Sequence, residues 1–160
     1  MAVREILLLG NPFLYEKATI ITPDDMPLLD QIIKDLHDTL FAFREKHGFG
    51  RAIAAPQIGY GKQIIYMFID KPQVIINPVF DHMSSEMFEV WDDCMSFPNL
   101  LVKVERHKRV EVSFSDEFLK KQSITFEDSL SELIQHEMDH LEGVLAVMKA
   151  KDKYSFKYKI

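Results

Sequence analysis

The sequence predicts a single α+β domain that spans residues 1–160. Apolar residues recur at helical spacing in two separate stretches, between positions 29 and 43 and between positions 130 and 141. Between these stretches lie short apolar or alternating segments bounded by turn residues, which is the pattern of β-strands. A chain of 160 residues is also long enough to bury one sizeable core.

Composition and charge restrict the class of function. Hydrophobic residues make up 47% of the chain and charged residues 28%, which is typical of a globular protein. The net charge of −6 and the scattered lysines and arginines argue against specific nucleic-acid binding. No apolar run approaches the length of a membrane span or of a signal peptide. The lone Cys94 excludes an internal disulfide and favours a reducing compartment, so we expect a cytoplasmic protein without a membrane partner.

The first long helix is expected to begin at residues 22–25, where Thr-Pro-Asp-Asp combines a cap, a proline for the first turn and two acids. It should run for about 22 residues and end at Gly48. His37 and His47 lie near or beside its apolar stripe, and we expect both to be structural or solvated. The stripe itself predicts a core-packing helix and consists of Leu29, Ile32, Ile33, Leu36, Leu40 and Phe43.

The segment 48–59 is rich in small residues and ends in Pro-Gln-Ile-Gly. This composition indicates backbone that approaches a ligand closely rather than an ordinary helix or strand, although a plain turn is an alternative. Gln57 is the more suggestive residue, because a positioned amide can donate a hydrogen bond to a developing oxyanion.

The middle of the chain predicts several strands and one turn. His107 is expected to face solvent, and residues 115–117 form a polar turn. Asn77-Pro78 is expected to end a strand. The segments with strand character are residues 63–69, 74–76, 87–91, 102–114, 122–126 and, from its alternating aromatic residues, 154–158.

A second helix carries the sequence His-Glu-Met-Asp-His at residues 136–140. Asp128-Ser129 is expected to open this helix and Gly143 to end it. Residues four apart lie on one helix face, so His136 and His140 could bind the same cation, with Glu137 placed to take a proton from water. The alternative is a pair of satisfied core histidines. The combination of all three residues favours a metal site.

Two histidines leave a catalytic metal one protein ligand short of the usual three. A single cysteine is normally a small buried hydrophobic residue, and this is the alternative reading of Cys94. Beside the two histidines, its thiolate is a candidate for the third ligand.

Three motifs together resemble the peptide deformylase family. That family carries GxGxAAPQ, EGCLS and QHExDH, and here residues 50–57 read GRAIAAPQ, residues 92–96 read DDCMS and residues 135–140 read QHEMDH. The segment 141–145 also looks like the continuation of the family pattern. The resemblance spans most of the chain with the motifs in the family's order.

The resemblance implies a metal-dependent hydrolase and a role for each motif. Glu137 would act as general base and then as general acid. Gln57 and the backbone N–H of Met95 would stabilise the oxyanion formed from a formyl group. One divalent metal ion per chain is implied, ferrous iron in the first place and otherwise Zn²⁺, Ni²⁺ or Co²⁺. Its ligands would be Cys94, His136 and His140.

The implied reaction removes the N-formyl group from the N-terminal methionine of a nascent chain and releases formate. The partner would be an N-formyl-methionyl peptide or a nascent chain, which is compatible with a transient contact with the ribosome. The small residues would let the substrate backbone lie alongside as an added strand, while an apolar pocket, with Ile134 as a candidate lining residue, takes the methionine. The residues expected to contact substrate are Gly50, Arg51, Ala52 and Asp93. The implied fold has mostly antiparallel sheets packed around the central HExxH helix, with the N-terminal helix against them.

The chain departs from the family pattern at three places. Ala52 replaces the second glycine of the first motif and would narrow the cleft, and Arg51 stands where an aliphatic residue is preferred and would charge its rim. Asp92-Asp93 replaces Glu-Gly before the cysteine, so Asp93 would stand where a positive φ suits only glycine well. We expect Asp92 to pair with Arg106.

Two other classes of function compete with a deformylase. One is a non-catalytic or altered-substrate homologue that keeps the metal site. Glu137 and Gln57 argue against a relic, since neither is needed to hold a metal. The other is a generic zinc peptidase, for which HExxH alone would suffice. Cys94 as third ligand disfavours it, because no later His or Glu has a clear claim to that place.

Overall fold

The computed structural model describes residues 3–159, and within this range the chain forms two α-helices and eight strands. Four short 3-10 helices connect them: η1 (Pro12–Tyr15), η2 (Pro23–Asp25), η3 (Ala55–Ile58) and η4 (Ala146–Lys149). The longer elements follow in the order α1 (Met26–His47), β1 (Ala52–Ala54), β2 (Ile64–Phe68), β3 (Pro72–Met83), β4 (Met87–Asp92), β5 (Leu100–His107), β6 (Arg109–Ser115), β7 (Lys121–Glu127), α2 (Ser129–Leu141) and β8 (Phe156–Tyr158).

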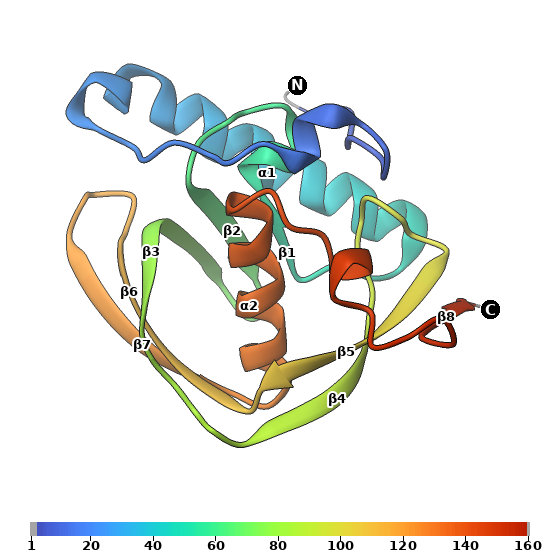
Figure 1. Ribbon diagram of the computed structural model, residues 1–160. Coiled ribbons are helices and arrows are strands. Elements are labelled where there is room, and N and C mark those ends of the chain that lie inside the picture. Colours follow the sequence, from blue (N-terminus) through green and yellow to red (C-terminus); the bar gives the residue numbers. More distant parts are fainter. Residues whose placement is uncertain (1–2, 160) are drawn as a thin grey trace.

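The strands form two antiparallel sheets. The larger sheet has the order β1-β2-β3-β6-β7, and the smaller has the order β4-β5-β8. Figure 1 shows α2 in the middle of the molecule, with β3, β6 and β7 curving past one side, β4 and β5 on the other, and α1 across the top. The α+β prediction with antiparallel sheets and an N-terminal helix is therefore confirmed. None of the helices between residues 3 and 159 has the length and apolar character that crossing a membrane requires.

Two strand predictions were wrong in their boundaries. The strand expected at 74–76 is the twelve-residue β3, which continues through Asn77-Pro78. The pairing of β3 with β6 shifts register there and Asn77 has a φ of 51°, so the residues expected to end the strand form an irregularity within it. The segment 102–114 is two strands, because the chain leaves the smaller sheet after β5 and enters the larger one as β6.

The other element predictions hold apart from details at their ends. The N-terminal α-helix has the expected 22 residues and the expected Gly48 cap, but η2 occupies the first turn, so α1 begins at Met26. The aromatic tail does form the strand β8, paired with β5. His107 was expected to face solvent and is instead half-buried, with its Nδ1 2.7 Å from the Ser84 carbonyl oxygen.

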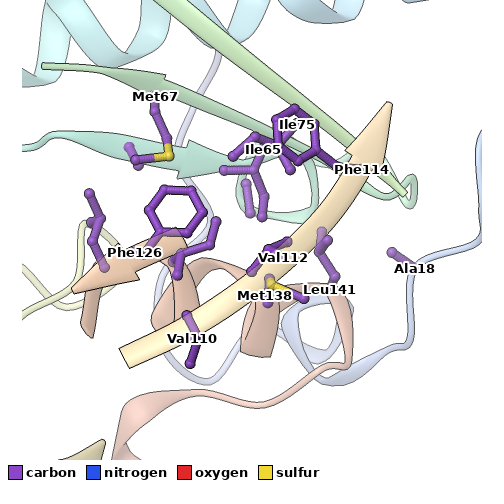
Figure 2. Packing of buried hydrophobic residues seen from close by; sticks show 14 residues of the cluster. Ala18, Ile65, Met67, Ile75, Val110, Val112, Phe114, Phe126, Met138 and Leu141 are labelled. Carbon is purple, nitrogen blue, oxygen red and sulfur yellow. The ribbon is translucent and has the colours of Figure 1, made fainter. Parts of the chain in front are cut away.

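One hydrophobic cluster fixes α2 against the larger sheet. Figure 2 shows side chains from β2, β3, β6 and β7 gathered against Met138 and Leu141 of α2. Ile134, one turn before Met138, is fully buried in the same cluster. The expectation that Ile134 lines a substrate pocket was therefore wrong, since it lies on the face of α2 that packs into the core.

The end of α2 depends on a glycine. Gly143 has a φ of 73°, and a Cβ added there would lie 2.5 Å from the Tyr15 carbonyl oxygen. Gly48 has a similar φ of 77°, but a Cβ there would have no heavy atom within 4 Å beyond its chain neighbours. At both positions an L-residue would have a strained backbone, because φ is positive. Only at position 143 would its Cβ also clash with another residue.

We therefore predict that Gly143→Ala lowers the free energy of unfolding by about 3 kcal/mol, since strain and overlap add. Gly48→Ala, with strain alone, should cost about 1 kcal/mol. Urea titration followed by circular dichroism measures both. Equal losses for the two variants would show that the contact with Tyr15 does not matter.

Candidate metal centre

The structure brings the three predicted metal ligands together. His136 and His140 lie one turn apart on α2, and Cys94 lies in the loop that follows β4. One donor atom from each residue lies within 4.8 Å of the others, and all three side chains are buried. The Cys94 Sγ is 3.3 Å from the His140 Nε2. A cluster of Cys, His and His of this kind can hold a metal ion.

The donor set fits a small divalent cation. Two ligand atoms at 2.0–2.3 Å from one tetrahedral ion lie about 3.5 Å apart, close to the separation of Cys94 Sγ and His140 Nε2. Burial and the neighbouring His136 lower the pKa of the His140 imidazole well below its ordinary value, which favours the neutral form that binds metals. Thiolate and imidazole together suit zinc and ferrous iron rather than magnesium or calcium.

Asp92 orients His136. The His136 Nδ1 lies 3.0 Å from the Asp92 Oδ2, so it donates to the carboxylate and leaves Nε2 free for a metal. Burial would lower the pKa of His136, but Asp92 and Cys94 outweigh it and raise that pKa. Burial would likewise raise the pKa of Asp92, but His136 and Arg106 outweigh it and lower that pKa, so Asp92 stays ionised. An imidazole that donates to a carboxylate is a more basic ligand.

Arg106 holds this carboxylate in place, as the sequence led us to expect. Its guanidinium is buried and donates from Nη2 to Asp92 and from Nη1 to Asp139, each at 2.6 Å. Arg106 lies on the same face of β5 as the buried Val102 and Val104, so strand alternation directs it inward. The guanidinium therefore ties the loop before Cys94 to the helix that carries the two histidines.

Glu137 is a buried carboxylate beside the ligand cluster. Its exposed fraction is 4%, and its Oε1 has no hydrogen-bond partner among residues 3–159. Burial raises the pKa of Glu137 to about 7. A carboxyl group with a pKa near neutrality can both accept and return a proton.

Two candidate hydrogen-bond donors lie near Cys94, the Gln57 side chain and the backbone N–H of Met95. The Gln57 Nε2 lies 3.7 Å from Cys94 Sγ and 3.2 Å from Ser96 Oγ, while its Oε1 accepts from the Ala54 N–H and fixes the amide. The backbone N–H of Met95 makes no hydrogen bond to any other described residue. An amide NH₂ and a free backbone N–H are both groups that can donate a hydrogen bond to a negatively charged oxygen.

A cavity of about 340 Å³ opens beside these groups, within the range of small-ligand sites. All four residues expected to contact substrate line it: Gly50, Arg51, Ala52 and Asp93. Ala52 belongs to the strand β1, so the expectation that this segment is not ordinary strand was wrong for residues 52–54. Asp93 has no positive φ, and its carboxylate pairs with Lys159 at 2.7 Å, so this loop needs no glycine.

The cavity also contains residues that the sequence did not single out. Glu132 and Leu133 lie on α2 one turn before His136 and Glu137, and Arg44 and Phe49 complete the wall. Burial raises the pKa of Glu132 to about 7. Glu132 could have been found from its spacing, because a residue four positions before a ligand on a helix shares its face.

Comparisons with known proteins find similar sequences over most of the chain. A family model described as polypeptide deformylase matches residues 3–155. A peptide deformylase of Pseudothermotoga lettingae is 37% identical, over 91% of this chain and 81% of its own. Peptide deformylase 1 of Prochlorococcus marinus is 33% identical, over 98% of this chain and 85% of its own.

Solved structures show the same similarity. A peptide deformylase from Synechococcus elongatus, in complex with actinonin, superposes with a TM-score of 0.88 at 31% identity, over 97% of this chain and 82% of that one. The enzyme from Thermotoga maritima has a TM-score of 0.85 at 28% identity, over 95% of this chain and 100% of that one.

We predict that Arg106→Leu destabilises the fold by about 3–5 kcal/mol, because it leaves Asp92 and Asp139 without their buried counter-ion. Arg109→Leu is the matched control, since the Arg109 side chain is 43% exposed and forms ion pairs only with surface glutamates, so its loss should cost less than about 1 kcal/mol. Urea titration measures both. Equal, small losses would show that the Arg106 ion pairs do not hold the site.

A second prediction concerns the ligand set. Cys94→Ala and His140→Ala should each lose most of the bound metal after dialysis, because two remaining ligands rarely retain a catalytic ion. His47→Ala removes an exposed imidazole outside the cluster and should keep full metal content. Elemental analysis of the purified variants measures the metal content per chain. Full metal content in Cys94→Ala would exclude Cys94 as a ligand.

Proposed function

The chain belongs to the peptide deformylase family, and on this premise we propose that it is a metal-dependent hydrolase that removes the N-formyl group from the N-terminal methionine of nascent polypeptides and releases formate. One observation carries the proposal. The buried carboxylate of Glu137 lies beside a Cys-His-His cluster, in a cavity that also contains the Gln57 side chain. A hydrolase needs this combination of a metal, a base and an oxyanion donor.

In this proposal Cys94, His136 and His140 hold the metal ion, which would polarise the formyl carbonyl and make water a better nucleophile. Glu137 takes the proton from the attacking water and then delivers it to the nitrogen of the leaving amine. Its pKa near 7 supports both halves of this transfer.

Two groups of the chain stabilise the oxygen that becomes negatively charged. The Gln57 Nε2 and the Met95 N–H would donate to it, and neither needs to move far, because Gln57 is already held through its Oε1 by the Ala54 N–H. Donors fixed before the reaction cost no reorganisation as charge develops.

The edge of the larger sheet can hold the substrate backbone. β1 pairs with β2 on one side only, and within the described chain no strand pairs with its other edge. Ala52 of β1 lines the cavity together with Gly50 and Arg51. An extended peptide could therefore add as a further strand beside β1, with its formyl group at the ligand cluster.

Membership of the family also supports proposals about the domain, the metal ion, the partner and the location. We propose that residues 1–160 act as one catalytic domain and that ferrous iron is the native ion, with zinc, nickel or cobalt able to replace it. The partner would be an N-formyl-methionyl peptide or nascent chain in the cytoplasm, in transient contact with the ribosome. A generic zinc peptidase is less consistent with the site, because the third donor is a thiol rather than a later His or Glu.

A second candidate is a homologue that keeps the metal site and the reaction but prefers another formylated residue. One observation favours it. The cavity wall carries the charged side chains of Arg51 and Glu132, whereas a methionine side chain calls for an apolar pocket.

The proposal predicts formate release from a formyl-peptide by anaerobically purified, iron-loaded protein. Glu137→Ala should lower kcat by about 10³-fold or more, since it removes the proton-transfer group, and should retain the metal. Formate dehydrogenase coupling measures the rate, with His47→Ala as the control that keeps it. Turnover that survives in Glu137→Ala would contradict the role of Glu137.

The rate of formate release should also decrease as the solution is made more acidic. The base must be ionised, so kcat/KM should fall as the pH decreases through the pKa of Glu137. Burial raises this pKa to about 7, and a bound cation lowers it again, so we expect the midpoint between 4.5 and about 7. A pH profile that is flat across this interval would exclude Glu137 as the base.

A further inference from the structure

We propose that Lys159, directly after β8, is a positioning residue for substrate binding, because its ammonium group joins Phe49 and Asp93, which lie in two separate loops of the cavity wall. This inference rests on the proposed function, since it concerns how the same cavity binds its substrate. It gives the last strand of the chain a part in the site that none of the three motifs contains.

The Lys159 ammonium has two contacts with the wall of the cavity. Its Nζ lies 2.7 Å from the Asp93 Oδ2 and 3.2 Å from the centroid of the Phe49 ring. Phe49 lies in the loop between α1 and β1, whereas Asp93 follows β4 in the loop that carries Cys94. These loops adjoin different sheets, because β1 belongs to the larger sheet and β4 to the smaller. Lys159 therefore connects two parts of the wall that the sheets do not connect.

The backbone holds Lys159 in this place. Its N–H donates to the Asn99 carbonyl oxygen at 2.9 Å, directly before β5. The strand β8 pairs with one edge of β5, and β4 pairs with the other. Lys159 and Asp93 are thus anchored to the same central strand, and the distance between them is set by the smaller sheet. The loop with Phe49 is the part that the ammonium contact adds to this frame.

The ion pair also accounts for the aspartate at position 93, where the family motif has glycine. A carboxylate there adds negative charge to a wall that already contains the carboxyl groups of Asp92, Glu132 and Glu137. Like charges close together are unfavourable, and the Lys159 ammonium places a positive charge beside the added one. The departure from the motif and the lysine that follows β8 therefore form one unit.

A lysine on the same strand shows the alternative role. The Lys157 Nζ lies 4.0 Å from the centroid of the Trp91 ring, and Trp91 is not part of the cavity wall. Such a contact fixes the strand without touching the cavity. Lys159 differs because both of its partners line the cavity, and Lys157 is the matched control.

The test measures kcat and KM for formate release from formyl-Met-Ala-Ser by iron-loaded Lys159→Met, which removes the charge and keeps an unbranched apolar side chain. Both contacts are partly exposed and individually weak, so we expect KM to rise by about fivefold. The value of kcat should stay within about twofold, because the groups proposed for the chemistry are unchanged. Lys157→Met should change neither constant.

Two further variants distinguish positioning from a merely structural contact. Lys159→Arg should restore KM, since a guanidinium can pair with a carboxylate and lie on an aromatic ring. Lys159→Met/Asp93→Asn should raise KM no more than Lys159→Met alone, because the two residues act through one contact. Calorimetric titration with the product peptide Met-Ala-Ser measures binding without turnover, and its Kd should follow the same order.

The outcomes separate this inference from the proposed function. An unchanged KM in Lys159→Met would overturn the inference and leave the deformylase proposal standing. A lower KM would also overturn it, by showing that Lys159 obstructs the cavity, and so would a fall in kcat with KM unchanged. Absence of turnover by the unaltered protein with its metal bound would overturn both.

Discussion

The buried guanidinium of Arg106 is the interaction on which the site depends. It joins Asp92, at the end of β4, to Asp139 on α2, and Asp92 in turn orients His136. The ligands come from segments more than forty positions apart, so some contact must set the distance between the Cys94 loop and the helix. The planar guanidinium of Arg106 does so by bridging two carboxylates with one N–H group each, and these carboxylates balance its buried charge.

The helix α2 serves packing and chemistry on opposite faces. Ile134, Met138 and Leu141 fix it in the core, while His136, Glu137 and His140 face the Cys94 loop. Rigid packing on one side holds the reactive groups on the other within small tolerances, which metal ligation and proton transfer both require. The cavity beside these groups is lined by residues of β1, of the loop before it and of α2.

Sequence reasoning identified the residues of the Cys-His-His cluster, because the information in the helix motif is local. The spacing of His136, Glu137 and His140 predicts a shared helix face, and Cys94 was the only thiol available to complete the set. The strand boundaries were harder to predict from the sequence. Asn77 is a residue type that commonly ends a strand, but here it forms an irregularity inside β3. Nothing in residues 102–114 marks the change of sheet after β5, which is set by tertiary pairing. Glu132 shares the helix face of His136, but only the folded chain shows that it lines the cavity.

The metal centre and the side-chain pocket place independent demands on the chain. The proposed hydrolysis would use the donor set, Glu137 and Gln57, whatever residue carries the formyl group. Arg51 and Glu132 lie outside that set, and their charges cannot assist a reaction at the formyl carbon as well as Glu137 can. Arg51 is exposed and Glu132 is half-buried, so water can hydrate both charges while the cavity is empty.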